Sequence, residues 1–127
     1  MSESVQVLVV DEDTDVLAIT REFLEHEDDT LEVTTVESAA AAIDRVASDS
    51  EGVDVVVTDL SMPEMSGVEL ASTVHEHAPE VPCVLYTAHD RETVEAEFDT
   101  TLSGHVRKRT GNEQYAELAS LVRDLAE

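Results

Sequence analysis

Apolar runs of the kind that form buried strands alternate with helical patterns along the whole chain. The runs at residues 5–10, 53–58 and 81–86 are nearly continuous in apolar residues, which is typical of strands covered on both faces of a sheet. Two shorter strand patterns occupy residues 31–35 and 103–107. Strict alternation of strands and helices predicts an α/β fold, with a parallel sheet, helices on both of its faces and right-handed crossovers.

Helices are expected in each interval between the strands. Apolar residues recur at helical spacing over residues 16–24, and residues 38–47 are rich in alanine. A third helix is expected from Gly67 to about residue 77, and a weak, polar helix at 90–98. The last helix is expected to open at Gly111. Five strand–helix units fill the 127 residues, so we expect one domain spanning residues 1–127.

The strongly negative net charge of the chain limits the kinds of molecule that it can bind. Thirty acidic residues face seven basic ones, which gives a formal net charge of -23. Such a surface repels nucleic acid, so direct nucleic-acid binding is not expected. Acidic residues are spread along a chain that is rich in Ala and Val, which is typical of proteins from salt-loving archaea. We therefore expect a halophilic protein whose self-repulsion is screened by molar salt.

The compartment is indicated by features that the sequence lacks. No apolar stretch approaches the roughly 20 residues of a membrane helix, so no membrane contact is expected. The N-terminus has no basic head of a secretion signal. Cys83 is the only cysteine, which excludes an internal disulfide and fits a reducing environment. These features predict a cytoplasmic protein.

Polar residues follow four of the five predicted strands. Asp11 and Glu12 follow the first strand, Asp59 the third, Thr87 the fourth and Lys108, the only lysine, the fifth. Ligands of doubly wound sheets bind beyond the carboxyl ends of the strands, so we expect these side chains to converge. Crowded carboxylates favour a hard cation such as Mg²⁺ (or Mn²⁺). One carboxylate can then attack phosphorus, while cation, ammonium and hydroxyl neutralise the phosphoryl oxygens.

Four stretches of this chain resemble the receiver (CheY-like) domains of response regulators in two-component systems. They are VLVVDEDTDVL at residues 7–17, VDVVVTDLSMPEMSGVEL at 53–70, VLYTA at 84–88 and SGHVRK at 103–108. Together they span nearly the whole chain in the order of the family. The Asp-x-x-Met-Pro-x-Met-x-Gly segment that starts at Asp59 is the most specific part. The resemblance implies a flavodoxin-like five-stranded sheet of order 2-1-3-4-5.

The resemblance also implies a role for each residue at the strand ends. Asp59 would be the phosphoacceptor, and Mg²⁺ (or Mn²⁺) would be held by Asp11, Glu12, Asp59 and the backbone carbonyl of Ser61. The hydroxyl of Thr87 and the ammonium of Lys108 would stabilise the phosphoryl group. The donor would be a phosphohistidine on a histidine kinase or phosphotransfer protein, so the chain would be a signalling phosphoacceptor rather than an enzyme. The output face, and a possible homodimer interface, would be the fourth helix, fifth strand and fifth helix.

Several positions depart from the family pattern or tune it. Glu12 replaces the more usual Asp, and Arg109 stands where the family commonly has Pro, which predicts a looser loop around the lysine. His105 stands where many members have the aromatic switch residue, and a histidine there predicts an output face sensitive to pH. Ser61 and His89 lie two residues beyond the acceptor and the threonine, where residues tune the lifetime of the phosphoryl group.

Two other functions remain open at this point. The run VVDEDTDV also resembles the first motif of haloacid-dehalogenase-type phosphatases, with Asp11 as nucleophile and Asp13 as acid/base. No later acidic motif follows Lys108, and no cap domain is present, which disfavours that function. Glu12 and Arg109 raise a second alternative, a degenerate receiver that binds partners without phosphorylation. The last helix resembles that of receivers that begin large sensor kinases, so the chain is either an independent protein or one domain of a longer one.

Overall fold

The fold is taken from a computed structural model that describes residues 4–49, 52–88, 102–109 and 111–126. The expected α/β architecture is present, with five strands and four helices in the described residues. In chain order the elements are β1 (Val5–Val10), α1 (Thr14–Glu27), β2 (Leu31–Val36), α2 (Ala39–Ser48), β3 (Val55–Thr58), α3 (Gly67–His77), β4 (Cys83–Thr87), β5 (Leu102–Arg107) and α5 (Glu113–Ala126).

The five strands form one parallel sheet of order β2-β1-β3-β4-β5, as the resemblance implied. Val10 lies opposite Thr58 in the β1–β3 pair, and Thr87 lies opposite Arg107 in the β4–β5 pair. This register brings the carboxyl ends of the strands to one edge of the sheet. The order reverses direction between β1 and β3, which is the kind of point where doubly wound sheets bind ligands.

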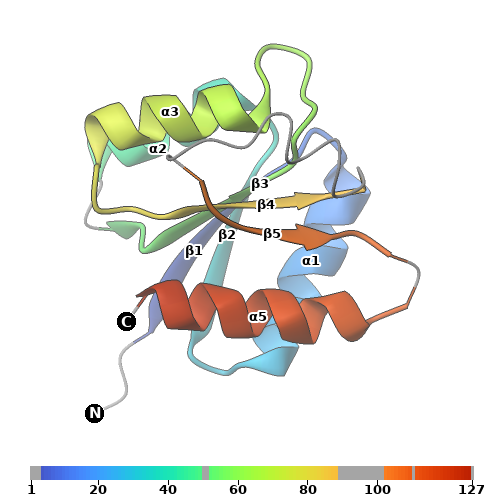
Figure 1. The fold of residues 1–127 in the computed structure, drawn as a ribbon. Helices are drawn as coiled ribbons and strands as arrows, with labels where there is room; N and C mark the ends of the chain where they lie inside the picture. The colour runs from blue at the N-terminus through green and yellow to red at the C-terminus, as the bar shows by residue number, and fades with distance from the viewer. Residues whose placement is uncertain (1–3, 50–51, 89–101, 110, 127) are drawn as a thin grey trace.

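Helices cover the sheet on both faces, so the core has two halves (Figure 1). Helices α2 and α3 pack on one face against residues such as Leu8, Val56 and Leu85. Helices α1 and α5 pack on the other face, against neighbouring strand residues that include Val9 and Val57. Successive strand residues point to opposite faces, and both faces are buried, which explains the continuous apolar runs.

Three elements begin later than the sequence pattern predicts. β3 begins at Val55 rather than residue 53; just before it, Asp54 forms hydrogen bonds to Gln6 of β1 through both its N–H and its side-chain carboxylate. β4 begins at Cys83 rather than residue 81, since Pro82 has no N–H to donate to a neighbouring strand. α5 begins at Glu113, because Gly111 has φ +99, outside the helical region.

Other predicted boundaries agree closely with the structure. Ser38 caps α2 as expected, with its hydroxyl accepting from the backbone N–H of Ala41. The predicted fifth strand is confirmed and starts one residue earlier, at Leu102. The predicted polar helix at 90–98 lies outside the described residues, as does His89. The helical part of the expected output face is therefore represented by α5 alone.

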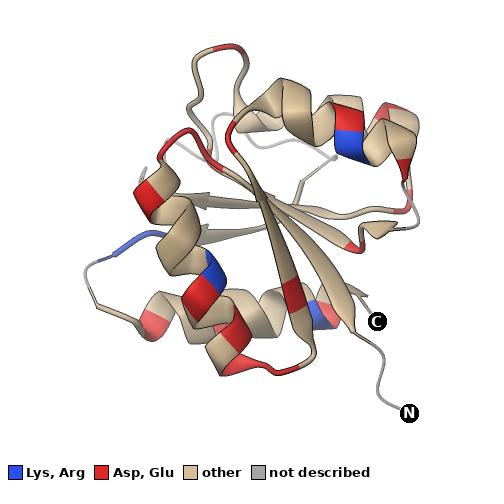
Figure 2. Cartoon of the chain, turned by 180° about the vertical axis from the view of Figure 1, so that it is seen from behind, with Lys and Arg blue, Asp and Glu red and all other residues tan. Residues whose placement is uncertain are grey.

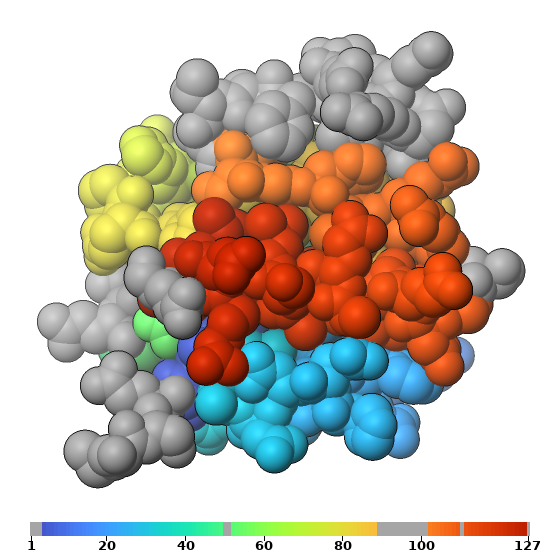
Figure 3. Space-filling view, turned by 60° about the horizontal axis from the view of Figure 1, so that its bottom comes forward, coloured from blue at the N-terminus to red at the C-terminus, as the bar shows by residue number. Residues whose placement is uncertain are grey.

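The charge pattern is visible on the described surface. Figure 2 shows acidic residues on several helices, on the connecting loops and on the sheet, with only a few basic residues among them. Figure 3 shows a face of the molecule on which α5 lies between β5 on one side and α1 on the other. No described helix combines the length and the apolar character that crossing a bilayer requires.

Candidate functional site

Backbone hydrogen bonds continue the sheet beyond the strand ends and position the site residues. The N–H of Asp59 donates to the carbonyl of Val10, at 3.3 Å. The N–H of Lys108 donates to the carbonyl of Thr87, at 2.8 Å. The four strand ends named in the sequence are therefore held side by side by the sheet itself. The expected convergence follows from the parallel register.

The ammonium of Lys108 bridges the two central carboxylates. Its Nζ lies 2.7 Å from Oδ2 of Asp11 and 3.4 Å from Oδ2 of Asp59. The Asp11 side chain is 6% exposed, and those of Lys108 and Asp59 are 19% and 20% exposed. Partial burial strengthens these interactions compared with a surface ion pair. The only lysine thus offsets part of the repulsion between two carboxylates and leaves the trio with a net negative charge.

The remaining carboxylate oxygens accept backbone hydrogen bonds. Oδ1 of Asp11 accepts from the N–H of Asp13 at 3.0 Å, and Oδ1 of Asp59 accepts from the N–H of Leu60 at 2.7 Å. These contacts fix the orientation of both groups. The Asp13 carboxylate accepts from the N–H groups of Asp15 and Val16, so it caps α1. That capping role accounts for Asp13 without the acid/base chemistry of a phosphatase.

The other predicted site residues differ in their exposure. Thr87 ends β4 and is buried, next to the lysine loop. Glu12 and Ser61 are exposed, close in sequence to Asp11 and Asp59. Across the described residues, no group of three or more Asp, Glu, His or Cys side chains is arranged to hold a metal ion. The structure therefore brings together Asp11, Asp59 and Lys108, while Glu12 stays outside this cluster.

The oxygen donors nevertheless suit a hard divalent cation. Asp11 and Asp59 direct one oxygen each at the same cationic group, the ammonium of Lys108. Carboxylate and carbonyl oxygens are the ligands that Mg²⁺ prefers, usually together with several waters. Two converging carboxylates are therefore a sufficient protein core for such a site. The chemistry of the donor set fits the implied metal.

Gly67 is a residue whose importance the sequence pattern only partly indicated. Its N–H donates to the carbonyl of Leu60 at 2.7 Å, and this bond closes the loop after Asp59. A Cβ at this position would lie 2.3 Å from the carbonyl oxygen of Asp59 and 2.9 Å from a methyl of Leu85. Only glycine lets the first turn of α3 approach the acceptor so closely. Gly67 ends the Asp-x-x-Met-Pro-x-Met-x-Gly motif, and the sequence pattern marks it only as the end of a loop. The motif itself could have indicated that the start of the next helix packs closely against the backbone of Asp59.

Two side chains near Lys108 were not identified from the sequence. The Nε2 of Gln114, a buried residue of α5, donates to the carbonyl of Arg109 at 2.9 Å. This bond ties the loop after β5 to α5 at the position where the family commonly has Pro. The ring of Tyr86 lies under the ammonium of Lys108, with 5.5 Å between Nζ and the ring centroid. No short sequence motif indicates either contact.

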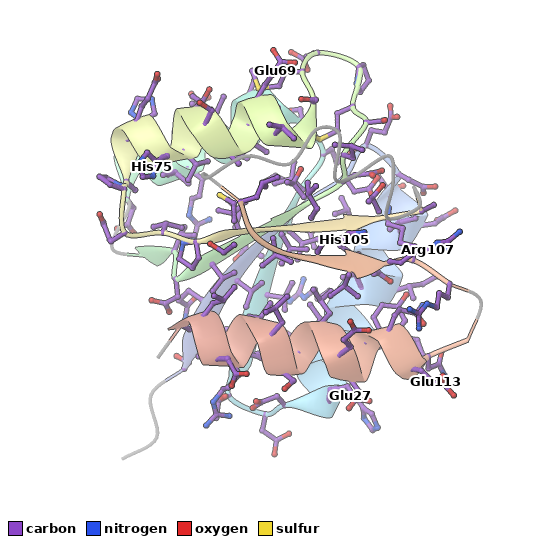
Figure 4. All side chains as sticks on the ribbon, in the orientation of Figure 1. Glu27, Glu69, His75, His105, Arg107 and Glu113 are labelled. Carbon is purple, nitrogen blue, oxygen red and sulfur yellow. The ribbon has the colours of Figure 1, made fainter. Side chains whose placement is uncertain are left out.

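His105 lies on β5, opposite Leu85, and is half-buried. Figure 4 shows His105 and Arg107 on this strand, between the helical layers. The register places His105 on the same sheet face as Leu85, whereas its neighbour Val106 packs on the face that α5 covers. The role of His105 as a pH-sensitive switch stays a prediction. Elsewhere, burial raises the pKa of the Cys83 thiol to about 12, which fits a packing role for that residue.

Comparison with a family model, with curated proteins and with solved structures gives matches to response regulators and their receiver domains. Residues 7–120 match the family model described as the response regulator receiver domain. The response regulator SaeR of Staphylococcus aureus is 29% identical over 86 residues, which cover 68% of this chain and 36% of SaeR. The chain thus spans about a third of the length of the curated relatives it matches.

Solved receiver structures superpose over nearly the whole chain. A receiver domain protein from Clostridium thermocellum has a TM-score of 0.83 at 21% identity, over 96% of this chain and 94% of that one, which supports the fold. The response regulator TrrA from Thermotoga maritima, solved in complex with Mg²⁺ and BeF, has a TM-score of 0.78 at 25% identity. That match covers 95% of this chain and 98% of TrrA.

Proposed function

Since the chain belongs to the family of response regulator receiver domains, we propose that it accepts a phosphoryl group on Asp59 in a two-component phosphorelay. The observation that carries this proposal is the bridge that Lys108 forms between Asp11 and Asp59 at the carboxyl ends of the strands. A carboxylate acceptor, an ammonium and a second carboxylate are the parts that phosphoryl transfer requires of a protein.

The proposed transfer is a displacement at phosphorus. A carboxylate oxygen of Asp59 forms a bond to phosphorus, while the bond from phosphorus to the donor histidine nitrogen breaks and leaves its electron pair on that nitrogen. Lys108 already contacts Asp59, so its charge is in place for the oxygens of the acyl phosphate. The hydroxyl of Thr87 would move toward the same group. The domain assists its own phosphorylation and dephosphorylation, and no other reaction is proposed.

The residues proposed to hold Mg²⁺ (or Mn²⁺) are Asp11, Glu12, Asp59 and the backbone carbonyl of Ser61. When bound, the cation supplies charge neutralisation at the transferring phosphoryl oxygens. The complex of TrrA with Mg²⁺ and BeF supports this assignment by similarity. Glu12 is exposed and directly follows Asp11 in the chain, so its carboxylate is accessible to a cation from solvent. The Lys108 ammonium would compete with a bound cation for the carboxylate oxygens of Asp11.

The proposed partners follow from the same reaction. The donor is a histidine kinase or a phosphotransfer protein in the cytoplasm, and the output surface is the helix 4, β5 and α5 face, which would also form any homodimer. His105 on β5 is the proposed switch residue, with Thr87 as the group that senses the phosphoryl state. Ser61 and His89 are proposed to set its lifetime.

Acetyl phosphate and Mg²⁺ provide the test of this function. We expect one phosphoryl group on Asp59, mapped by mass spectrometry, and no label in Asp59→Asn. The matched control is Asp44→Asn, the same chemical change at an exposed position of α2, which should label as the wild type does. A label on Asp11 would instead indicate a phosphatase, and the absence of any label a phosphorylation-independent interaction module. Either result would overturn the proposal.

A further inference from the structure

Lys108 has an aromatic ring on one side and the two carboxylates on another. Its Nζ is 5.5 Å from the centroid of the Tyr86 ring and 2.7 Å from Asp11. Tyr86 directly precedes Thr87 in β4 and is only 3% exposed. A cation within about 6 Å of a ring face is attracted by the quadrupole of the ring, and more strongly in a desolvated site.

The Tyr86 ring belongs to a row of aromatic side chains. The chain has only two Phe and two Tyr residues. Phe23 of α1 stacks on Tyr115 of α5, with centroids 4.8 Å apart and planes at 10°. Tyr115 contacts Tyr86, with centroids 6.0 Å apart and planes at 57°. Three of the four aromatic residues thus form one row that ends under the only lysine, and Tyr86 cannot turn away without breaking this packing.

The backbone on either side of Lys108 is already fixed. The N–H of Lys108 donates to the carbonyl of Thr87, and the carbonyl of Arg109 accepts from Gln114. The remaining freedom of Lys108 lies in its long side chain, which has several rotatable bonds. The two carboxylates hold its ammonium from one side, and the face of the Tyr86 ring is a further contact that restrains it from another.

We propose that Tyr86 is a positioning residue, whose ring face holds the Lys108 ammonium over the Asp11–Asp59 pair and ready for a phosphoryl group on Asp59. This inference rests on the proposed function. A neutral ring attracts the ammonium without adding a third negative charge that would repel the incoming phosphoryl group. Burial, the largest of several causes, raises the pKa of the Tyr86 phenol, so the ring remains neutral at physiological pH.

The single lysine makes the contact directly measurable by NMR. Lysine labelled with ¹³C at Cε gives one methylene signal from this chain, because Lys108 is its only lysine. In the wild type we expect the attached protons to be shifted upfield by the ring current of Tyr86. Tyr86→Phe keeps the ring and the shift, whereas Tyr86→Leu moves the signal toward that of free lysine. An unchanged signal in Tyr86→Leu would overturn the proposal.

Phe23→Leu is the matched control for this experiment. It removes a ring from the same aromatic row, at the end that stacks on Tyr115 rather than under Lys108. We expect it to lower stability, as Tyr86→Leu does, while the lysine signal stays at its wild-type position. Tyr86→Met serves as a second variant without a ring, in case the leucine variant does not fold. A shift in Phe23→Leu as large as in Tyr86→Leu would indicate a general packing effect and overturn the proposal.

Phosphorylation kinetics separate positioning from a structural role. With acetyl phosphate and Mg²⁺, we expect Tyr86→Leu to lower the rate of Asp59 labelling by about three- to tenfold, as expected for loss of one partly exposed cation–π contact. Tyr86→Phe and Phe23→Leu should label at the wild-type rate. A wild-type rate in Tyr86→Leu would overturn the positioning role. A wild type that takes no label at all would overturn the proposed function instead, while the lysine signal would still report on the ring contact.

Discussion

At the scale of single residues, the site depends on short distances between Asp59 and its neighbours Lys108 and Gly67 rather than on any unusual side chain. Aspartate is abundant in this chain, and Asp59 differs from the others in its surroundings. Its carboxylate meets Lys108 at 3.4 Å, and its backbone carbonyl meets the start of α3 at Gly67. The local backbone therefore sets where the carboxylate points. A change that moves this backbone should affect phosphorylation even though it leaves every polar group in place.

Gly67→Ala tests this dependence. Its Cβ would lie 2.3 Å from the carbonyl oxygen of Asp59, a backbone atom that cannot move without displacing the acceptor. We expect a loss of about 1–3 kcal/mol in the free energy of unfolding and slower labelling of Asp59 by acetyl phosphate. Gly104→Ala is the control, because its Cβ would meet only the end of the Leu121 side chain, which can rotate. Equal effects of the two substitutions on labelling would contradict this account.

At the scale of secondary-structure elements, apolar runs predicted all five strands and the order in which polar residues follow them. Asp11, Asp59 and Thr87 were placed correctly at strand ends because parallel strands share one direction. The pattern did not predict that the Asp54 carboxylate would bond to the backbone of β1, since a side chain that bonds to a neighbouring strand looks like any other polar residue. Nor did it predict the contacts of Tyr86 and Gln114 with the lysine loop. Periodicity indicates which face of an element is buried, but not which partner it meets there.

The contact between α1 and α5 offers a test with a defined pH dependence. Asp28, which follows α1, accepts hydrogen bonds from the hydroxyl and N–H of Thr30 and from Arg123 of α5, and these lower the pKa of Asp28 to about 2. A folded-state pKa below the unfolded value of 3.8 means that ionised Asp28 stabilises the fold above about pH 4. This stabilisation is lost as the pH falls toward 2. Since the Arg123 side chain is 42% exposed, we expect only about 1 kcal/mol.

Asp28→Asn should therefore be less stable than the wild type near neutral pH, and the difference should shrink between pH 4 and 2. Urea unfolding of both proteins across this range measures it, and the comparison removes the contribution of the other carboxylates. Asp44→Asn, at an exposed position of α2, is the matched control and should show no such dependence. A difference between Asp28→Asn and the wild type that is constant from pH 7 to pH 2 would mean that the charge of Asp28 does not contribute.

At the scale of the whole molecule, the net charge of -23 is the property that the fold alone does not explain. Acidic residues lie on several helices and on the loops that connect the elements, so repulsion acts over much of the surface (Figure 2). Most of these charges have no nearby base, because the chain has only seven basic residues. Repulsion of this kind destabilises the compact state, and salt weakens it by shortening the Debye length to about 3 Å at 1 M.

We therefore predict that stability rises with KCl concentration, as expected for a protein adapted to a salt-rich cytoplasm. Urea unfolding at about 0.1 M and about 2 M KCl should give a higher free energy of unfolding in the concentrated salt. Part of any such rise is a general salt effect, so a second protein is needed for comparison. Glu22→Gln, Glu76→Gln and Glu117→Gln together remove three exposed charges without changing side-chain size.

In this triple variant we expect higher stability in 0.1 M KCl and a smaller gain in 2 M KCl, because less repulsion remains to be screened. Equal stability of the wild type in both salts would contradict the halophilic interpretation. A triple variant with the same salt dependence as the wild type would assign the gain to a general effect of KCl rather than to surface charge. The acidic surface would then be explained by a partner with a basic face. That partner would bind at the strand ends that carry Asp59.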